Sequence, residues 1–375
     1  MPDKLICISI LRFFGDLTDP RQLGKVLYPL PEIILVGLCA AICGANSFVE
    51  MATFGKAKLD FLRKLLPFKN GTPSHDTFGA VFANLDARQF NEIFIRWIMS
   101  LQKTLPRHVA IDGKTVRGSA NGDIPAVHIL SAWSSDQRLV IGQLKTKMKS
   151  NEITAIPELL SMLSVKGALI TIDAMGCQKE IASKIIDKEA DYLLAVKKNQ
   201  RNLYNDIEMI FASAESETFP VKILEKETID KSHGRIENRF YSLIDDKELI
   251  SSMNEWKGLK CIGKVKRICI MGAKETEETR YFICSKEVDI DEFSDTVRSH
   301  WGIENSLHWV MDIVFRDDAS RVREKNAAAN FVTLKHITLN MLKSLPGKKS
   351  MRVRRKLAGW DEDFLLEALM ATPAA

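Results

Sequence analysis

The sequence predicts a mixed α/β protein, in which one sheet carries helices on both faces. Three observations lead to this prediction. Residues from about 8 to 100 have helical periodicity. After them, short apolar runs and helical segments follow one another in the order β-β-β-α-β-α-β, which combines a meander with right-handed crossovers. A second group of strand-like runs, at about 216–286, then precedes two long helical segments.

The N-terminal part is expected to be a helical domain, residues 1–105. Pro31 lies in the first turn of the apolar segment Ile33–Ala45, as is common at the start of a helix. This segment is too short to span a bilayer and is typical of a buried core helix. Ser74 follows a turn and is expected to cap the next helix. An amphipathic helix over Gln89–Leu105 ends the domain.

The middle of the chain is expected to form the main sheet. Three apolar runs separated by turn residues predict consecutive antiparallel strands, at His108–Asp112, Ala126–Trp133 and Leu139–Leu144. Further strands are expected at Ala168–Asp173 and Tyr192–Val196. The helices between and after them are expected at Glu152–Leu163, Gln178–Glu189 and Gln200–Ala214.

The rest of the sequence predicts one domain over residues 106–345, with a β-rich insertion at about 216–286. The interrupting strands are expected at Val221–Ile223, Arg239–Leu243, Leu259–Ile270 and Arg280–Cys284, and the closing helices at Asp291–Phe315 and Ala327–Leu345. Residues 346–375 are expected to be a basic tail. From Lys343 to Lys356 there are seven basic residues and no acid. Such a cluster is either a solvated tail or a nucleic-acid contact.

The composition is that of a soluble globular protein and narrows the possible functions. The chain has 375 residues, of which 46% are hydrophobic and 27% charged, and a net charge of +5. This charge permits a polyanionic partner without requiring one. The seven cysteines include no Cys-x-x-Cys pair, which indicates reduced thiols and a cytoplasmic location. The sequence has no phosphate-binding Gly-x-x-x-x-Gly-Lys loop, nucleophile elbow or zinc-ligand spacing.

Three carboxylates are the candidate catalytic residues. Asp112 and Asp173 each end an apolar strand-like run, and ligands gather at the carboxyl ends of strands in α/β sheets. Glu304 lies in an aromatic-rich segment that is apolar on two helical stripes, so we expect it to be largely buried. Buried carboxylates are costly unless a cation neutralises them. The three residues therefore predict a divalent-metal site.

Each carboxylate also has an ordinary structural interpretation. The two aspartates are compatible with turn residues, since each precedes a glycine within three positions. Glu304 is compatible with an ion pair to Arg298 or Lys335. His308, one helical turn beyond Glu304, is better interpreted as a core histidine than as a metal ligand.

Several segments together resemble a known family, namely residues 71–77 (Gly-Thr-Pro-Ser-His-Asp-Thr), 110–119, 149–158, 171–178, 192–199, 232–235 (Ser-His-Gly-Arg) and 300–309 (His-Trp-Gly-Ile-Glu-Asn-Ser-Leu-His-Trp). They are similar to the H-repeat-associated group of bacterial insertion-sequence DDE transposases over nearly the whole chain. The resemblance implies an RNase H-like catalytic core, and it implies catalytic and metal-binding roles for Asp112, Asp173 and Glu304. It also implies Mg²⁺ as the cofactor, with Mn²⁺ as a substitute and two ions per site.

The chain departs from related transposases near the glutamate. Relatives often carry Tyr, Arg and Lys at fixed spacing around it, whereas Val297, His300 and Met311 occupy those positions here. We expect Arg298 and His300 to substitute as DNA contacts. Lysines at the strand ends are expected to hold phosphates, although ordinary solvated lysine is an equal interpretation. These lysines are Lys114, Lys197 and Lys198.

The expected function is DNA-mediated transposition of an insertion-sequence-like element, with metal-dependent strand cleavage followed by strand transfer. The expected partners are the element ends and the target DNA, bound by a homodimer in the cytoplasm or on the nucleoid and without a membrane. Two alternatives remain open at this point. One is an inactive relic that only binds DNA, and the other is a nuclease without strand transfer.

Overall fold

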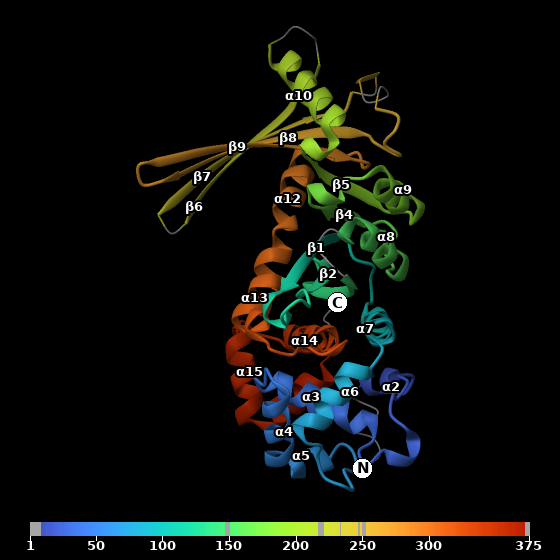
Figure 1. Ribbon diagram of the computed structural model, residues 1–375. Helices are drawn as coiled ribbons and strands as arrows, with labels where there is room; N and C mark the ends of the chain where they lie inside the picture. Colours follow the sequence, from blue (N-terminus) through green and yellow to red (C-terminus); the bar gives the residue numbers. More distant parts are fainter. Residues whose placement is uncertain are drawn as a thin grey trace.

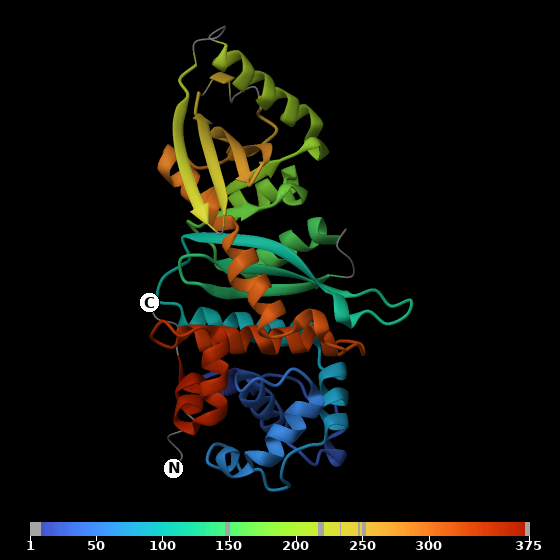
Figure 2. The ribbon, with the colours of Figure 1, turned by 90° about the vertical axis from the view of Figure 1, so that its left-hand side faces the viewer.

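The computed structural model describes residues 9–146, 151–216, 221–232, 234–246, 248–249 and 253–371. The N-terminal region is helical, as predicted, and forms a bundle at one end of the molecule (Figures 1 and 2). Its main helices are α2 (Ser9–Phe14), α3 (Leu30–Ile42), α4 (Phe48–Ala57), α5 (Leu59–Arg63), α6 (His75–Asn84) and α7 (Ala87–Leu101). The Ser74 side chain caps α6 by accepting a hydrogen bond from the Thr77 N–H, as expected.

The central sheet confirms the predicted element order. Its strands are β1 (His108–Val116), β2 (Val127–Ser134), β3 (Leu139–Thr146), β4 (Leu169–Ile172) and β5 (Asp191–Val196). The first three strands form an antiparallel meander, while β1, β4 and β5 are parallel. Helices α8 (Glu152–Met162) and α9 (Lys179–Asp187) connect β3 to β4 and β4 to β5. The spatial order β3-β2-β1-β4-β5 confirms the expected RNase H-like mixed sheet.

The interrupting strands extend the central sheet. Helix α10 (Arg201–Glu215) is followed by β6 (Leu224–Ser232), β7 (Arg235–Ile244), β8 (Cys261–Met271) and β9 (Lys274–Cys284). These four strands form an antiparallel meander, and β9 pairs antiparallel with β5. The result is a nine-stranded sheet whose outer strands project as an arm (Figure 1).

The prediction of the first interrupting strand was wrong. The expected strand Val221–Ile223 is irregular, and the edge strand begins only at Leu224. This strand, Leu-Glu-Lys-Glu-Thr-Ile-Asp-Lys-Ser, is mostly polar and none of its residues is buried. An edge strand of this composition has no apolar alternation from which it could be recognised.

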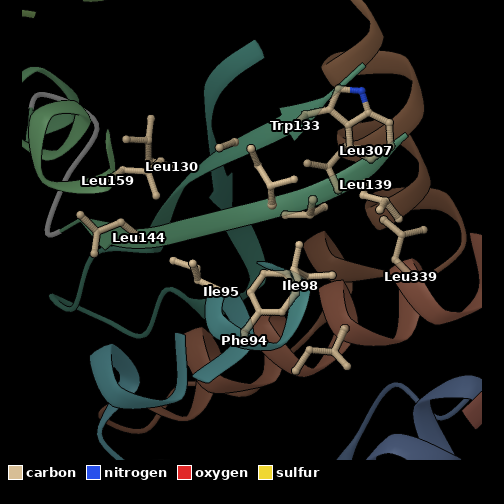
Figure 3. Packing of buried hydrophobic residues seen from close by; sticks show 14 of the residues in the cluster. Phe94, Ile95, Ile98, Leu130, Trp133, Leu139, Leu144, Leu159, Leu307 and Leu339 are labelled. Atoms are coloured by element: carbon tan, nitrogen blue, oxygen red, sulfur yellow. The ribbon is translucent and has the colours of Figure 1, made fainter. Parts of the chain in front are cut away.

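The last part of the chain joins the bundle to the sheet. Helix α12 (Ile290–His300) continues through a π-helical segment (Glu304–His308) into α13 (Trp309–Ile313). Helix α14 (Ala327–Ser344) is almost completely buried between the bundle and β3 (Figure 2). Figure 3 shows this packing, in which Phe94 and Ile98 of α7 and Leu339 of α14 lie under Leu139 of β3.

The expected basic tail is instead folded into α15 (Met351–Trp360) and α16 (Glu362–Met370). Arg354 and Arg355 are 7% and 5% exposed, so they are not solvated. Arg354 donates hydrogen bonds to carbonyl oxygens at the end of α14, and Arg355 donates to the carbonyl oxygens of Ala41 and Val314. Helix ends leave carbonyl groups unpaired, and these guanidinium groups satisfy them. Among the described residues, no helix is both long and apolar enough to cross a membrane.

Candidate active site

The two aspartates lie at the same edge of neighbouring parallel strands. The pairing of β1 with β4 ends at Ile111 and Ile172, so Asp112 and Asp173 are the next residues of their chains. Asp112 does not end its strand, contrary to expectation, because β1 continues beside β2 to Val116. Asp173 follows β4 directly, and its Oδ1 accepts a hydrogen bond of 3.0 Å from the Met175 N–H.

Glu304 comes to this edge from the helical run opposite. It is the first residue of the π segment and lines a pocket of about 900 Å³ together with Asp173, His300, Lys197 and Lys198. Contrary to the expectation of burial, Glu304 is exposed. An inserted π turn changes the rotational register of a helix, so a stripe drawn with 3.6 residues per turn does not continue through it. Single π turns of this kind are frequent at functional sites.

The ion pairs considered for Glu304 are not present. Arg298 pairs with Asp230, and Lys335 pairs with Asp317. Within the described ranges, no basic nitrogen lies within 4.0 Å of the Glu304 carboxylate. Its charge is therefore available to the pocket.

Negative charges crowd around Asp112. Its side chain is 22% exposed, and its pKa is raised to about 7, first by burial and then by the charges of Asp173, Glu152 and Glu304. The backbone N–H of Gly113 opposes this rise, but a buried carboxyl group with three acidic neighbours is still suited to a cation. However, among the residues that the structure describes, no three His, Cys, Asp or Glu side chains are grouped closely enough to hold a metal ion.

His308 connects the π segment to the first aspartate. Its Nδ1 lies 3.5 Å from Asp112 Oδ2, and its side chain is 14% exposed. Burial, followed by the nearby charge of Lys114, lowers the pKa of His308 to about 3, so the ring is neutral at neutral pH. The largely buried ring agrees with the core position expected from the sequence, while its contact with Asp112 was not foreseen.

A buried polar pair beside Asp112, His128 and Glu152, was not expected from the sequence. His128 Nε2 lies 2.6 Å from Glu152 Oε1, and its Nδ1 lies 2.8 Å from the Thr115 hydroxyl. His128 and Glu152 are 2% and 4% exposed. Glu152 stands in the segment 149–158 that carries part of the family resemblance, which was the available signal. Gly113 lies directly over this pair, since a Cβ there would be 2.3 Å from Glu152 Oε1 and 2.4 Å from His128 Nε2.

The close approach at Gly113 leads to a stability prediction. Replacing Gly113 with alanine is expected to lower the free energy of unfolding by about 1–3 kcal/mol, because a methyl group must displace a buried hydrogen-bonded pair. Urea denaturation of the purified variant measures this loss. Gly24→Ala is the control, since a Cβ at Gly24 meets nothing within 4 Å. An unfolding midpoint of Gly113→Ala equal to that of the control would contradict the packing described.

Two histidines share the hydroxyl group of Thr171. His108 Nε2 and His300 Nδ1 each lie 2.9 Å from Thr171 Oγ1. Burial is the main reason that the pKa of each histidine is lowered to about 4. Both rings are therefore neutral at neutral pH. His300 is a neutral hydrogen-bonding group in this pocket, and not the cation that a substitute for arginine would be.

The expected basic contacts differ in their availability. Lys114 is 14% exposed and lies 2.5 Å from Asp312 and 3.4 Å from Asp318, so its charge is already neutralised. Lys197 and Lys198 are exposed at the pocket, and no carboxylate of the described residues lies within 4.0 Å of either amine. In the motif Ser232–Arg235, Ser232 ends β6 and pairs with Arg235, the first residue of β7, while His233 lies outside the described residues.

Two aspartates that follow the paired ends of adjacent parallel strands, and a glutamate from a facing helix, define a candidate member of the DDE class on this RNase H-like sheet. The family model described as "Transposase DDE domain" matches residues 103–341, and the model described as "DDE_Tnp_1-associated" matches residues 11–98. The chain belongs to the DDE transposase family.

Curated relatives place the chain within this family. It is 42% identical to "Putative transposase YncI" of Escherichia coli O157:H7 over 93% of this chain and 92% of the relative. It is 41% identical to "H repeat-associated putative transposase YhhI" of Escherichia coli (strain K12), over 96% and 97%. These matches confirm the resemblance to the H-repeat-associated group. A shorter match, 43% identical over 17% of this chain and 75% of the relative, is to "Inactive transposase YbfQ" of Escherichia coli (strain K12).

Proposed function

We propose that this protein cuts and joins DNA at the ends of an insertion-sequence-like element, with Asp112, Asp173 and Glu304 as the catalytic residues. The observation that carries the proposal is the position of these carboxylates: Asp112 and Asp173 follow the last paired residues of β1 and β4, and Asp173 and Glu304 line one pocket. Burial, and then the charges of Asp173, Glu152 and Glu304, raise the pKa of Asp112 to about 7. Membership of the DDE transposase family supports the same assignment.

The three carboxylates are of the residue type that binds divalent metal ions, which DDE transposases generally use, although the described carboxylates are not grouped as a three-ligand site. Carboxylate oxygens are the ligands that Mg²⁺ prefers, and Mg²⁺ keeps coordination positions for water and phosphate. Asp112, Asp173 and Glu304 are the proposed ligands of two Mg²⁺ ions, with Mn²⁺ as a substitute. Bound ions of this kind activate the attacking oxygen and stabilise the leaving oxygen in phosphodiester transfer.

The protein side chains have distinct roles in the proposed reaction. His308 positions the Asp112 carboxylate by its contact at 3.5 Å. Lys197 and Lys198 hold DNA phosphates through their free positive charges. A water oxygen bonds to phosphorus as the bond to the 3′-oxygen breaks, which leaves a 3′-hydroxyl group on one strand. That hydroxyl then attacks a phosphorus of target DNA and displaces a second 3′-oxygen.

We also propose the domains, the partner, the oligomeric state and the location of this protein. We propose that residues 1–105 form a helical domain that accompanies the catalytic domain of residues 106–345, with the β-rich insertion at about 216–286. DNA is the proposed partner, both as element ends and as target. A homodimer is proposed because two element ends must be paired, and the proposed location is the cytoplasm and the nucleoid.

A relic that only binds DNA is the second candidate. Two observations favour it: the described carboxylates are not grouped as a three-ligand metal site, and one relative is named as inactive. Such a protein would bind DNA with a salt-dependent affinity but would not cut it in the presence of Mg²⁺ or Mn²⁺. A nuclease would cut DNA without joining strands.

Purified protein and the DNA flanking its coding region separate these candidates. The substrate is a labelled duplex that contains the flanking inverted repeat, incubated with supercoiled plasmid and Mg²⁺ or Mn²⁺. A transposase is expected to produce nicked ends and plasmid-joined product. Cleavage without joined product would indicate a nuclease, and metal-independent binding without cleavage would indicate a relic.

A further inference from the structure

A second pocket lies on the arm, next to the candidate active site. It has a volume of about 250 Å³ and is formed by strands β7, β8 and β9 together with the end of α12. The residues that distinguish it are five arginines, namely Arg235, Arg239, Arg267, Arg280 and Arg298. We call this site the arginine pocket.

The register of the arm concentrates these arginines on one face. Arg239 of β7 lies directly opposite Arg267 of β8, and Arg267 lies opposite Glu278 of β9. Like charges directly opposite one another destabilise a strand pair. Glu237 offsets this repulsion, since it is 2% exposed and forms ion pairs with Arg235, Arg239 and Arg267.

The arginines outnumber their carboxylate partners. Besides Glu237, Glu278 pairs with Arg280 through contacts of 2.7 and 3.1 Å, and Asp230 pairs with Arg239 and Arg298. Five guanidinium groups therefore face three carboxylates. The excess charge is held in fixed positions, because each guanidinium has a carboxylate to orient it.

The indole ring of Trp301 lies close to two of these guanidinium groups. The centre of its indole ring is 5.3 Å from the Arg280 guanidinium carbon and 5.8 Å from that of Arg267. Cation–π contact holds planar guanidinium groups against a ring. Arg267 and Arg280 remain 24% and 35% exposed, so their edges are accessible to a ligand.

The arginine pocket is continuous with the pocket of the carboxylates. Arg280, Trp301 and Val297 line both. Trp301 is three residues before Glu304 in the same helical run. A DNA strand whose scissile phosphate lies at the carboxylates therefore has neighbouring phosphates within reach of the arginines.

We infer that the arginine pocket binds a phosphate group of the DNA strand beside the bond that is cut, with Arg267 and Arg280 as its main donors. Guanidinium groups match phosphate oxygens with paired hydrogen bonds, and an anion relieves the repulsion between opposed arginines. The inference rests on the proposed function, since it names a substrate contact of the same site. It assigns to the arm a direct role in holding DNA.

Salt-dependent DNA binding tests the inference. Arg267→Gln/Arg280→Gln is compared with wild type on a fluorescein-labelled, mixed-sequence DNA duplex without added metal. The loss of this phosphate contact is expected to reduce the slope of log affinity against log salt by about 1, and the affinity at low salt by about 10-fold or more. Arg267→Lys/Arg280→Lys, which keeps the charge, is expected to retain most of the slope.

Lys264→Gln/Lys266→Gln is the matched control. It removes two positive charges from β8, but from positions that alternate with Arg267 and so belong to the opposite face. The control is expected to keep the wild-type slope. A wild-type slope in Arg267→Gln/Arg280→Gln, or an equal loss in the control, would overturn the inference.

Failure of the inference is distinguishable from failure of the proposed function. A wild-type protein that neither binds nor cuts DNA refutes the proposed function. Normal cleavage by wild type together with unchanged binding by the arginine variant refutes only the arginine pocket. Thermal unfolding of each variant shows that it is folded before its binding is compared.

Discussion

Metal-dependent strand cleavage is expected to fall by at least about 10²–10³-fold when Asp112 is replaced by asparagine, the scale on which one charge-stabilising group contributes to catalysis. Asn keeps the shape of the side chain but removes the charge that binds a cation. Asp173→Asn and Glu304→Gln are expected to have losses of the same order. Cleavage of the flanking-repeat duplex with increasing Mg²⁺ measures the effect.

DNA binding provides an internal control for these variants. In the absence of metal, each substitution removes a negative charge from the pocket, so DNA affinity is expected to stay equal or to rise. Asp123→Asn and Glu287→Gln make the same chemical changes at exposed positions and should retain cleavage. Full cleavage by Asp112→Asn, Asp173→Asn or Glu304→Gln would rule out that residue as a catalytic ligand.

The largest stability effect is expected at a buried ion pair next to the active site. Lys335 of α14 and Asp317, in the turn after α13, are 1% and 2% exposed in their side chains and form a salt bridge. Replacing Lys335 with methionine is expected to lower the free energy of unfolding by about 3–5 kcal/mol, because an uncompensated buried carboxylate remains. Burial already raises the pKa of Asp317 although Lys335 lowers it, so protonation of Asp317 in the variant limits the loss.

A double substitution tests the cause of this effect. Lys335→Met/Asp317→Asn removes both charges and is expected to be more stable than Lys335→Met alone. Urea denaturation of the wild type, both single variants and the double variant completes the thermodynamic cycle. A double variant that loses the sum of the two single losses would show that the pair has no coupling energy.

Much of the fold could be predicted because its signals are local. Apolar runs separated by turn residues marked β1, β2 and β3, and apolar runs alternating with helical periods marked β4 and β5. The pairing of β9 with β5 was not predictable in this way. The two paired segments lie far apart in sequence, and both are apolar, so no alternation of polar and apolar side chains indicates which residues pair. The edge strand β6 was misplaced because none of its residues is buried, so its sequence does not alternate between apolar and polar side chains.

The sequence indicated the candidate carboxylates but not the polar groups that surround them. Asp112 and Asp173 were candidates because each follows an apolar strand-like run, although β1 continues beyond Asp112. His128 and Glu152 were missed because a histidine in β2 and a glutamate at the start of α8 meet only where α8 crosses the sheet behind Gly113. The arginine pocket was missed for the same reason, since its members come from three strands and a helix.

The sequence by itself determined the order of elements, the family and the three candidate carboxylates, because each depends on residue types and short spacings. Only the tertiary structure decided which groups are charged and accessible. The π segment exposed Glu304 to the pocket, and Asp312 and Asp318 neutralised Lys114. Arg354 and Arg355, which the sequence placed in a basic tail, are buried and donate hydrogen bonds to otherwise unpaired carbonyl groups. Burial and pairing depend on contacts between distant segments, which no single stretch of sequence contains.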